Sequence, residues 1–359
     1  MSDLDKPGFG LDTESSSESD SERQQMGSIE QDHLALVERM KAGREQLIAE
    51  LKKVIIGQHD IVDELLIALF AGGHCLISGV PGLAKTLLIK TVADILQLDF
   101  SRIQFTPDLM PADVVGTEIV KEENGDRNMI FVKGPIFTNI LLADEINRTP
   151  PKTQSALLEA MEEKQVTAAG ITHKMTKPFF VLATQNPVEL EGTYPLPEAQ
   201  LDRFMFKLVI DYLPEEDEMK VVTSTTQTQN VEFSHPLTGQ DILDFQTVAR
   251  QVPAAESVVR YAVRLAAASR PQSETAPDFI KNWVSWGAGL RASQNLILAG
   301  KVRALLLGRF NVSYNDIQSL AMSVFRHRII LNFHAEAERV TTEDVIKRLI
   351  ETVPVPSGN

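Results

Sequence analysis

The stretch Gly79-Val80-Pro81-Gly82-Leu83-Ala84-Lys85-Thr86 decides how this chain of 359 residues is expected to fold. It follows an apolar run at 74–78 and leads into another at 87–92, so it lies where a strand turns into a helix. Glycines at such a turn let backbone N–H groups face an anion, and the first turn of the helix adds partial positive charge. The pattern predicts a phosphate-binding loop. The alternative is an ordinary Gly/Pro turn before an amphipathic helix, with the Lys-Thr pair present by chance.

Three positions of this loop carry specific expectations. Lys85 is predicted to reach the β- and γ-phosphates of a nucleotide, and the Thr86 hydroxyl to bind Mg²⁺. Ala84 stands where a second glycine is usual. Because a left-handed backbone is costly for alanine and a helical one suits it, we expect Ala84 to lie already in the first turn of the helix.

A second signal follows downstream, in the apolar run Asn139-Ile140-Leu141-Leu142-Ala143, which ends in Asp144 and Glu145. Continuous apolar runs are typical of buried parallel strands, and ligands collect at the carboxyl ends of such strands. Asp144 is therefore predicted to hold Mg²⁺ through water, and Glu145 to polarise the attacking water. The alternative is a strand followed by two solvated acids, which is less favoured because a phosphate loop accompanies it.

Two further polar residues follow apolar strands. The run at 179–184 ends in Gln185-Asn186-Pro187, and the Asn186 amide is a candidate to position water against the γ-phosphate. Arg203 ends a short helical stretch before the strand expected at 205–210. Its alternative role is a surface salt bridge with Asp202.

Taken together, these motifs resemble the MoxR family of AAA+ ATPases. The resemblance covers roughly residues 35–353 and rests on four blocks, of which the last is the most family-specific: Gly-Val-Pro-Gly-Leu-Ala-Lys-Thr at 79–86, Ala-Asp-Glu-Ile-Asn-Arg at 143–148, Ala-Thr-Gln-Asn-Pro at 183–187, and Gly-Thr-Tyr-Pro-Leu-Pro-Glu-Ala-Gln-Leu-Asp-Arg-Phe at 192–204. It implies a parallel α/β sandwich with an all-helical C-terminal lid, and ATP with Mg²⁺ as cofactors.

The resemblance also implies a role for each matching residue. Residues 79–86 match Walker A, Asp144 and Glu145 match Walker B, and Asn186 matches sensor 1. Arg203 matches the arginine finger, which completes a neighbouring subunit's site. The sensor 2 arginine is kept as Arg291, although this chain reads Gly-Ala-Gly-Leu-Arg-Ala at 287–292 where the family usually has Gly-Ala-Ser-Pro-Arg-Ala. Gly57, in the stretch 54–58, matches part of the adenine pocket; an ordinary turn between helices is the alternative.

Composition sets the broad class. A hydrophobic content of 43% allows a sizeable core, and the length suggests two domains. No apolar run is long enough to span a membrane and the first residues lack a signal-peptide core, so we expect a cytoplasmic protein. Cys75 is the single cysteine, which excludes an internal disulfide and favours simple packing.

The expected domains are an acidic, Ser-rich disordered tail at 1–30, an ATPase core at 31–213, a helical lid at 214–353 and a short tail at 354–359. Within the core, two hairpins are predicted, one from the β-like runs at 117–121 and 128–133 and one at 163–178. In related AAA+ proteins such insertions face the pore of the ring, so both are candidates to touch substrate.

The region after residue 214 has helical patterns, and we expect it to carry Arg291 over the nucleotide. Capping signals begin at Ser313 and Thr341. Trp283 and Trp286 are expected to lie in the core of this lid. The predicted helices are 237–250, 255–270, 291–308, 313–326 and 341–352.

The resulting functional hypothesis is a ring, expected to be a hexamer, that hydrolyses ATP to remodel or mature a protein complex. A finger arginine acts only across a subunit boundary, so this chemistry needs a neighbour. The resemblance implies a protein client, with von Willebrand factor A domain proteins as candidates. One alternative is a nucleic-acid motor: the net charge of −14 argues against it, although Lys164, Lys174 and Lys177 would allow a local basic pore. A non-hydrolysing nucleotide switch is disfavoured by Glu145.

Overall fold

The computed structural model describes residues 35–356, except 81, 124–125, 169, 187–191 and 228–230. The predictions for Pro81 and for the acidic tail at 1–30 lie outside the described residues. The first described helical stretch covers residues 35–51, within the 31–53 stretch that has helical spacing.

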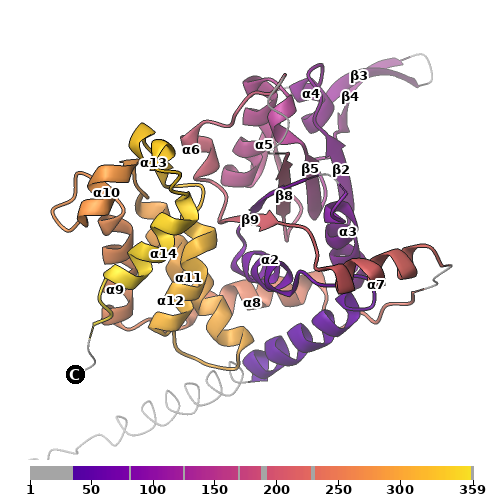
Figure 1. The fold of residues 1–359 in the computed structure, drawn as a ribbon. Coiled ribbons are helices and arrows are strands. Elements are labelled where there is room, and N and C mark those ends of the chain that lie inside the picture. The colour runs from indigo at the N-terminus through magenta and orange to yellow at the C-terminus, as the bar shows by residue number, and fades with distance from the viewer. Residues whose placement is uncertain are drawn as a thin grey trace, which may run out of the picture.

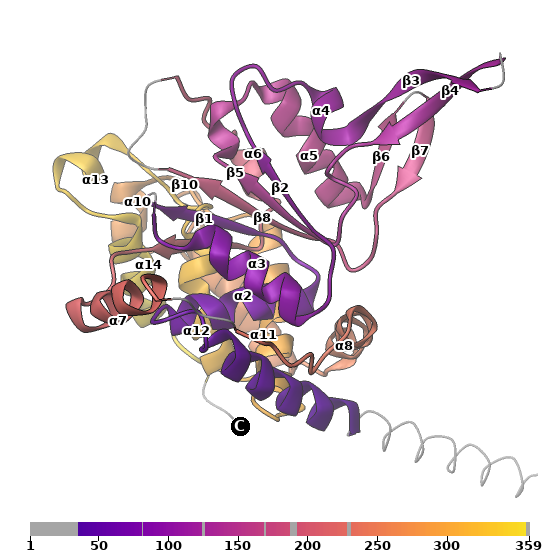
Figure 2. The ribbon, with the colours of Figure 1, turned by 90° about the vertical axis from the view of Figure 1, so that its right-hand side faces the viewer.

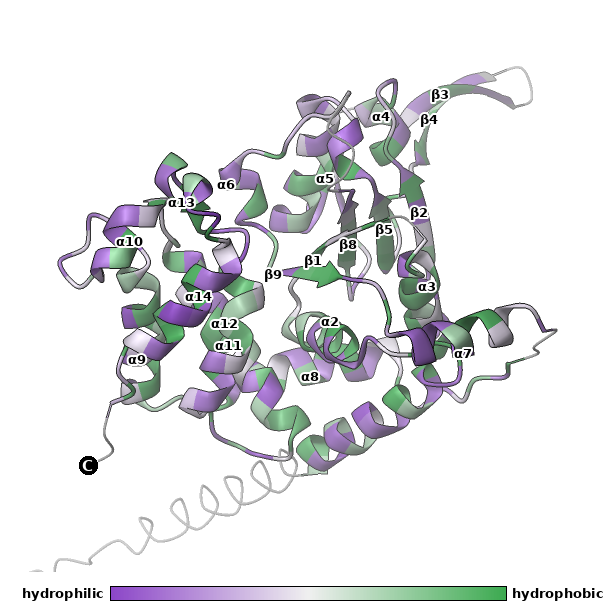
Figure 3. Cartoon of the chain, in the orientation of Figure 1, coloured by the Kyte–Doolittle hydropathy of each residue, from purple (hydrophilic) through white to green (hydrophobic). Residues whose placement is uncertain are grey.

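Five parallel strands form a central sheet in the order β2-β5-β8-β1-β9. Their bounds are Phe100–Gln104 for β2, Ile140–Asp144 for β5, Phe180–Gln185 for β8, Cys75–Gly79 for β1 and Phe206–Ile210 for β9. Figure 3 shows the strongly hydrophobic character of β5 and β8, which the sequence predicts as buried strands. Because all five strands run in the same direction, their carboxyl ends meet at one edge of the sheet.

Alternate residues of each central strand enter two different cores, because side chains of a strand point to opposite faces in turn. In β5, Ile140 and Leu142 join one core, and Leu141 and Ala143 join the other. Helices cover both faces (Figure 1). The helical stretch at 35–51, α2 (His59–Ala71) and α3 (Lys85–Ile95) contribute to the first core, and α4 (Pro111–Val115) and α5 (Pro151–Glu163) to the second.

Two antiparallel hairpins project from the α4–α5 side, as predicted (Figure 2). Their strands are β3 (Gly116–Glu123), β4 (Asp126–Lys133), β6 (Gln165–Ala168) and β7 (Ile171–Lys174). The hairpins contact each other where the ring of Phe131 in β4 stacks on His173 in β7, with centroids 4.3 Å apart. The two insertions therefore lie side by side.

The C-terminal part is mainly helical, in agreement with the prediction. All five predicted helices are present, as α8 (Gly239–Gln251), α9 (Glu256–Ala268), α11 (Leu290–Leu306), α12 (Tyr314–Phe325) and α14 (Thr342–Thr352). Five further elements are not among the predicted ones: α7 (Glu215–Thr225), α10 (Asp278–Trp283), α13 (Phe333–Ala337), and the short strands β10 (Val284–Trp286) and β11 (Ile330–Leu331). Both predicted caps form: the side chains of Ser313 and Thr341 accept hydrogen bonds from the backbone N–H of Asp316 and Asp344.

The expectation that both tryptophans lie in the lid core is wrong for Trp286, which is 64% exposed. Helix α10 ends at Trp283, and the chain then continues as strand β10. The spacing of three residues therefore does not put the two rings on one helix face. Trp283 is half-buried, and its indole N–H donates to Glu338 at 2.9 Å.

The C-terminal helices pack directly on the α/β part. Helix α8 contacts α2, α12 contacts the edge strand β9, and one continuous core includes residues of all four elements. In the part of the chain that the structure describes, no helix is both long and apolar enough to cross a membrane.

Candidate functional site

The loop between β1 and α3 has the backbone of an anion cradle, but Ala84 is not in the helix. Ala84 is the N-cap of α3, with φ 55° and ψ 20°, so the prediction that it lies in the first helical turn is wrong. Gly82 is also left-handed, at φ 87°, and a Cβ there would meet no atom within 4 Å. Left-handed residues within a loop turn successive N–H groups toward one point. The cost for Ala84, roughly 1–2 kcal/mol, is thus the cost of shaping the loop.

Lys85 opens α3 and points back across the loop, where its Nζ donates to the carbonyl oxygen of Gly79 at 2.7 Å. Burial lowers the pKa of Lys85, and the nearby Asp144 and Glu145 oppose this shift. A partly desolvated ammonium group that donates to a neutral carbonyl oxygen is stabilised further when an anion binds beside it. The geometry therefore favours binding of phosphate.

The predicted residues from three parts of the chain converge on one cavity of about 480 Å³ at the carboxyl edge of the sheet. Lys85 and Thr86 come from the start of α3, Asp144 and Glu145 from the end of β5, and Asn186 from the end of β8. Asn186 is only 7% exposed. The full lining is Gly82, Leu83, Ala84, Lys85, Thr86, Leu87, Arg102, Gln104, Asp144, Glu145, Thr184 and Asn186.

The two acids are held in place by hydrogen bonds from neighbouring strands. The Thr184 hydroxyl donates to Asp144 Oδ1 at 2.6 Å, and Thr184 Oγ1 accepts the backbone N–H of Glu145 at 2.9 Å. Glu145 itself has a left-handed backbone, with φ 56° and ψ 48°. Its carboxylate accepts from Gln104 Nε2 at 2.7 Å and lies 3.3 Å from Arg148. Both carboxylates thus keep defined positions at the cavity.

Three residues of this site were missed by the sequence analysis: Arg102, Gln104 and Thr184. Arg102 donates to Asp144 Oδ2 from Nη2 at 2.6 Å and from Nε at 3.2 Å. Strand β2 is polar and is not an apolar run, which is why its role went unseen. Arg102 and Gln104 are two residues apart, so they share one face of β2. The alternation of polar and apolar residues at 102–104 of β2 was the signal that could have placed Arg102 and Gln104 at the site.

The donor set fits a nucleotide with Mg²⁺. Magnesium prefers oxygen ligands and usually keeps several waters, and the cavity lining supplies one carboxylate from Asp144 and one hydroxyl from Thr86. The loop N–H groups and Lys85 match the negative charge of phosphates. The residues that could hold the metal are therefore the two that the sequence predicts.

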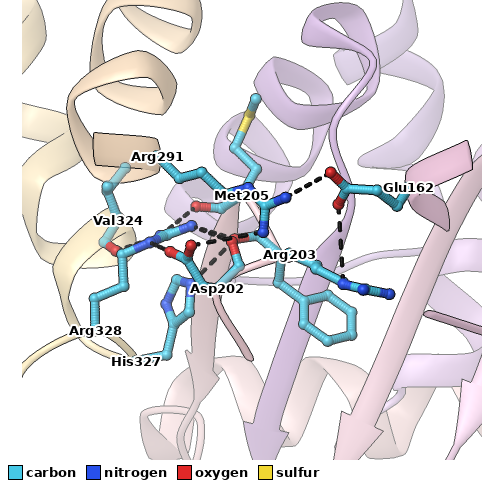
Figure 4. Close-up of polar contacts among 9 residues, drawn as sticks. Glu162, Asp202, Arg203, Met205, Arg291, Val324, His327 and Arg328 are labelled. Carbon is cyan, nitrogen blue, oxygen red and sulfur yellow. Dashed lines mark hydrogen bonds and ion pairs between the residues drawn. The ribbon is translucent and has the colours of Figure 1, made fainter. Parts of the chain in front are cut away.

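Arg203 and Arg291 lie at a different place, around Glu162 at the end of α5 (Figure 4). Arg291 Nη2 is 2.5 Å from one Glu162 oxygen, and Arg203 Nε is 3.9 Å from the other. Neither arginine is among the residues that line the 480 Å³ cavity. In the described structure Arg291 instead pairs with Glu162 at the end of α5 and lies 3.7 Å from Asp202, so its contact with this chain's own nucleotide stays a prediction.

The alternative role of Arg203, a surface salt bridge with Asp202, is wrong, because Asp202 pairs with Arg328 instead. The buried guanidinium of Arg328 donates to the Asp202 carboxylate at 2.7 Å, to the Asp202 carbonyl at 2.9 Å and to the Phe204 carbonyl at 2.7 Å. These bonds fix the backbone on both sides of Arg203 (Figure 4). The Arg203 side chain itself remains about one third exposed.

Gly57 lies at a second cavity, of about 350 Å³, together with residues of the first described helix and of α2. Its φ is 69°, and a Cβ on Gly57 would come within 2.8 Å of Leu213. The left-handed backbone is what favours glycine here, since the Leu213 methyl lies at the end of a flexible side chain. Its part in binding adenine stays a prediction.

Comparisons with known proteins agree with this geometry. The family described as "ATPase family associated with various cellular activities (AAA)" matches residues 74–206, and an AAA lid domain matches residues 279–349. Chaperone MoxR1 of Mycobacterium tuberculosis is 42% identical over 315 residues, covering 88% of this chain and 83% of that protein. Protein MoxR of Methylorubrum extorquens is 28% identical, covering 86% and 93% of the two chains.

A solved structure is similar over almost the whole chain. The crystal structure of a candidate ATPase from Cytophaga hutchinsonii aligns with a TM-score of 0.85 and 42% identity, covering 93% of this chain and 99% of that one. The two family-model matches span the phosphate loop, both acids and Arg291. The chain belongs to the MoxR family of AAA+ ATPases.

Proposed function

We propose that this protein binds ATP with Mg²⁺ in the 480 Å³ cavity, hydrolyses it, and uses the cycle to remodel or mature a protein complex. The observation that carries the proposal is the convergence of Lys85, Thr86, Asp144, Glu145 and Asn186 from separate elements on that cavity. The relative named as a chaperone supports the second half of the proposal.

In this proposal each residue has one task. Lys85 and the loop N–H groups hold the phosphates, and Thr86 and Asp144 hold the metal, which offsets charge on the phosphate oxygens. Glu145 takes a proton from the attacking water, and Asn186 orients that water. The hydrogen bonds of Thr184 keep both acids aligned for these tasks.

We place the two remaining arginines in the site of a neighbouring subunit. Arg203 and Arg291 both contact Glu162, are partly exposed, and do not line the chain's own cavity. Two cations on one surface, both paired with Glu162, match the phosphates of an adjoining nucleotide site. The proposed assembly is a ring of this chain, with six copies as the expected number.

Mixing two inactive variants tests this arrangement. Arg203→Ala and Glu145→Gln should each be inactive alone, but in mixed rings some interfaces pair an intact Glu145 with a neighbour's intact Arg203. Partial ATPase activity is therefore expected to return. Native mass spectrometry should confirm that mixed rings form, and a dilution series with wild-type subunits should show whether one inactive subunit stalls the whole ring. If mixed rings form, stalling is excluded and activity does not return, the role of Arg203 in trans is contradicted.

A second mixture locates the action of Arg291. If Arg203 and Arg291 both serve the neighbour, mixing Arg203→Ala with Arg291→Ala leaves every mutant interface short of one arginine, and activity should not recover. If Arg291 serves its own nucleotide, the same mixture creates complete sites and activity returns. The charge-matched control is Arg260→Ala, on the outer face of α9, where the side chain pairs with Glu256.

The client in this proposal is a protein, with von Willebrand factor A domain proteins as candidates, and the place of action is the cytoplasm. The paired hairpins are the proposed contact region, since they project from the core and expose apolar side chains. Those more than 40% exposed on β3, β4 and β7 are Ile119, Val120, Met129, Val132 and Ile171.

The nucleic-acid alternative is not favoured by the local charges. Lys164, at the foot of the second hairpin, is turned inward with its Nζ 3.0 Å from His74 Nε2, and burial lowers the pKa of Lys164 to about 8. The neighbouring hairpin carries exposed Glu118 and Glu122 as well as exposed Lys121, Arg127 and Lys133, so it is not a uniformly basic surface. Only Lys174 and Lys177 of the predicted basic pore remain exposed.

We expect weak DNA binding, with a dissociation constant above roughly 10⁻⁴ M at physiological salt. Tighter binding would need clustered Lys and Arg side chains that contact several phosphates at once. Fluorescence anisotropy with single- and double-stranded DNA at two salt concentrations measures it. Tight binding that weakens as salt is added would favour the motor.

A further inference from the structure

Strand β2 places a cation on the carboxylate proposed to hold the metal. Arg102 donates two hydrogen bonds to Asp144 Oδ2, at 2.6 and 3.2 Å, and a third to Gln104 Oε1 at 2.7 Å. The other Asp144 oxygen accepts from Thr184 at 2.6 Å. Without metal, both oxygens of Asp144 are therefore engaged by protein donors.

The backbone fixes where this guanidinium can go. Strands β2 and β5 pair in register, with Arg102 opposite Leu142 and Gln104 opposite Asp144. The Arg102 side chain is about half exposed, and it lines the same cavity as Lys85. A partly exposed ion pair is weak and exchanges readily. Arg102 can therefore leave Asp144 by side-chain rotation and still face the cavity.

We propose that Arg102 is a further positioning residue of the nucleotide site, one that substitutes for Mg²⁺ on Asp144 in the metal-free state and releases Asp144 when Mg²⁺ binds. This inference rests on the proposed nucleotide site. Its reason is electrostatic: a guanidinium at 2.6 Å and a hydrated dication compete for the same carboxylate lone pairs and repel each other.

Because Arg102 compensates Asp144 without metal, nucleotide binding to the wild-type protein should depend less on Mg²⁺ than binding to a variant that lacks this cation. In Arg102→Gln, metal-free nucleotide meets an uncompensated Asp144, so its affinity should fall about tenfold. With saturating Mg²⁺ the dication compensates Asp144, and the affinity should change by less than about threefold. The affinity with Mg²⁺ divided by the affinity without Mg²⁺ should therefore be roughly three- to tenfold larger for Arg102→Gln than for the wild type.

The experiment is equilibrium binding of a fluorescent ADP analogue to the full chain, once with EDTA and once with saturating MgCl₂. Arg102→Lys keeps the charge and should restore part of the metal-free affinity. Arg127→Gln, an equal change of charge on the exposed first hairpin, should leave both affinities unchanged. Thermal melting checks that each variant is folded.

The outcomes separate this inference from the proposed function. An unchanged ratio in Arg102→Gln, or an Arg102→Lys variant no better than Arg102→Gln, would overturn the role of Arg102 while leaving the nucleotide site intact. Failure of the wild-type chain to bind the ADP analogue under either condition would refute the nucleotide site itself.

Discussion

Lys85→Ala should lose ATP binding while the protein stays folded. Lys85 is the cation that closes the phosphate loop, and a charge-assisted bond to two phosphates has no replacement when the ammonium is removed, so we expect affinity to fall at least roughly a hundredfold. The fold should tolerate the change, because burial already disfavours the charged form of Lys85 and lowers its pKa. Alanine is also a good helix former at the first position of α3.

Titration calorimetry with ATP and Mg²⁺ measures the loss, and thermal melting measures the fold. The matched control is Lys90→Ala, which removes an exposed lysine from the same helix. Lys90→Ala should bind ATP as the wild type does. An affinity of Lys85→Ala equal to that of the wild type would refute the assignment of the phosphate loop.

The sequence was sufficient for the parts of the site that follow from strand order. Apolar runs ending in polar residues predicted β5 and β8, and parallel strands must present their carboxyl ends at one edge, so Asp144, Glu145 and Asn186 had to approach the loop at Lys85. The two hairpins and the five C-terminal helices were predictable because turn and capping signals act within a few residues of the chain.

What failed was decided by tertiary context. The backbone of Ala84 contradicts its local preference, because the shape of the whole loop sets that residue's φ. The ion pair between Arg291 and Glu162 at the end of α5 was not foreseen either, because the hydrophobic pattern of a helix does not state which polar neighbour its first residues meet. Arg102 was missed since its strand is polar, although it donates two hydrogen bonds to Asp144.

Glu145→Gln should keep ATP binding and lose turnover. The amide has the size of the carboxylate but cannot accept a proton from water, so the rate should fall by roughly 10²–10⁴ if Glu145 is the general base. The local structure should survive, because the backbone N–H of residue 145 still reaches Thr184 and an amide oxygen can still accept from Gln104. Asp144 and Lys85, which hold metal and phosphate, are unchanged.

Phosphate release and nucleotide binding should be measured on the same preparation, because only their combination separates a missing base from a damaged site. Glu159→Gln is the control: it makes the same chemical change on an exposed position of α5, and should leave both values as in the wild type. Loss of binding together with turnover would mean that Glu145 helps to hold the nucleotide. Turnover near the wild-type rate would move the base to another residue, and then the left-handed backbone that presents Glu145 to the cavity would need a different explanation.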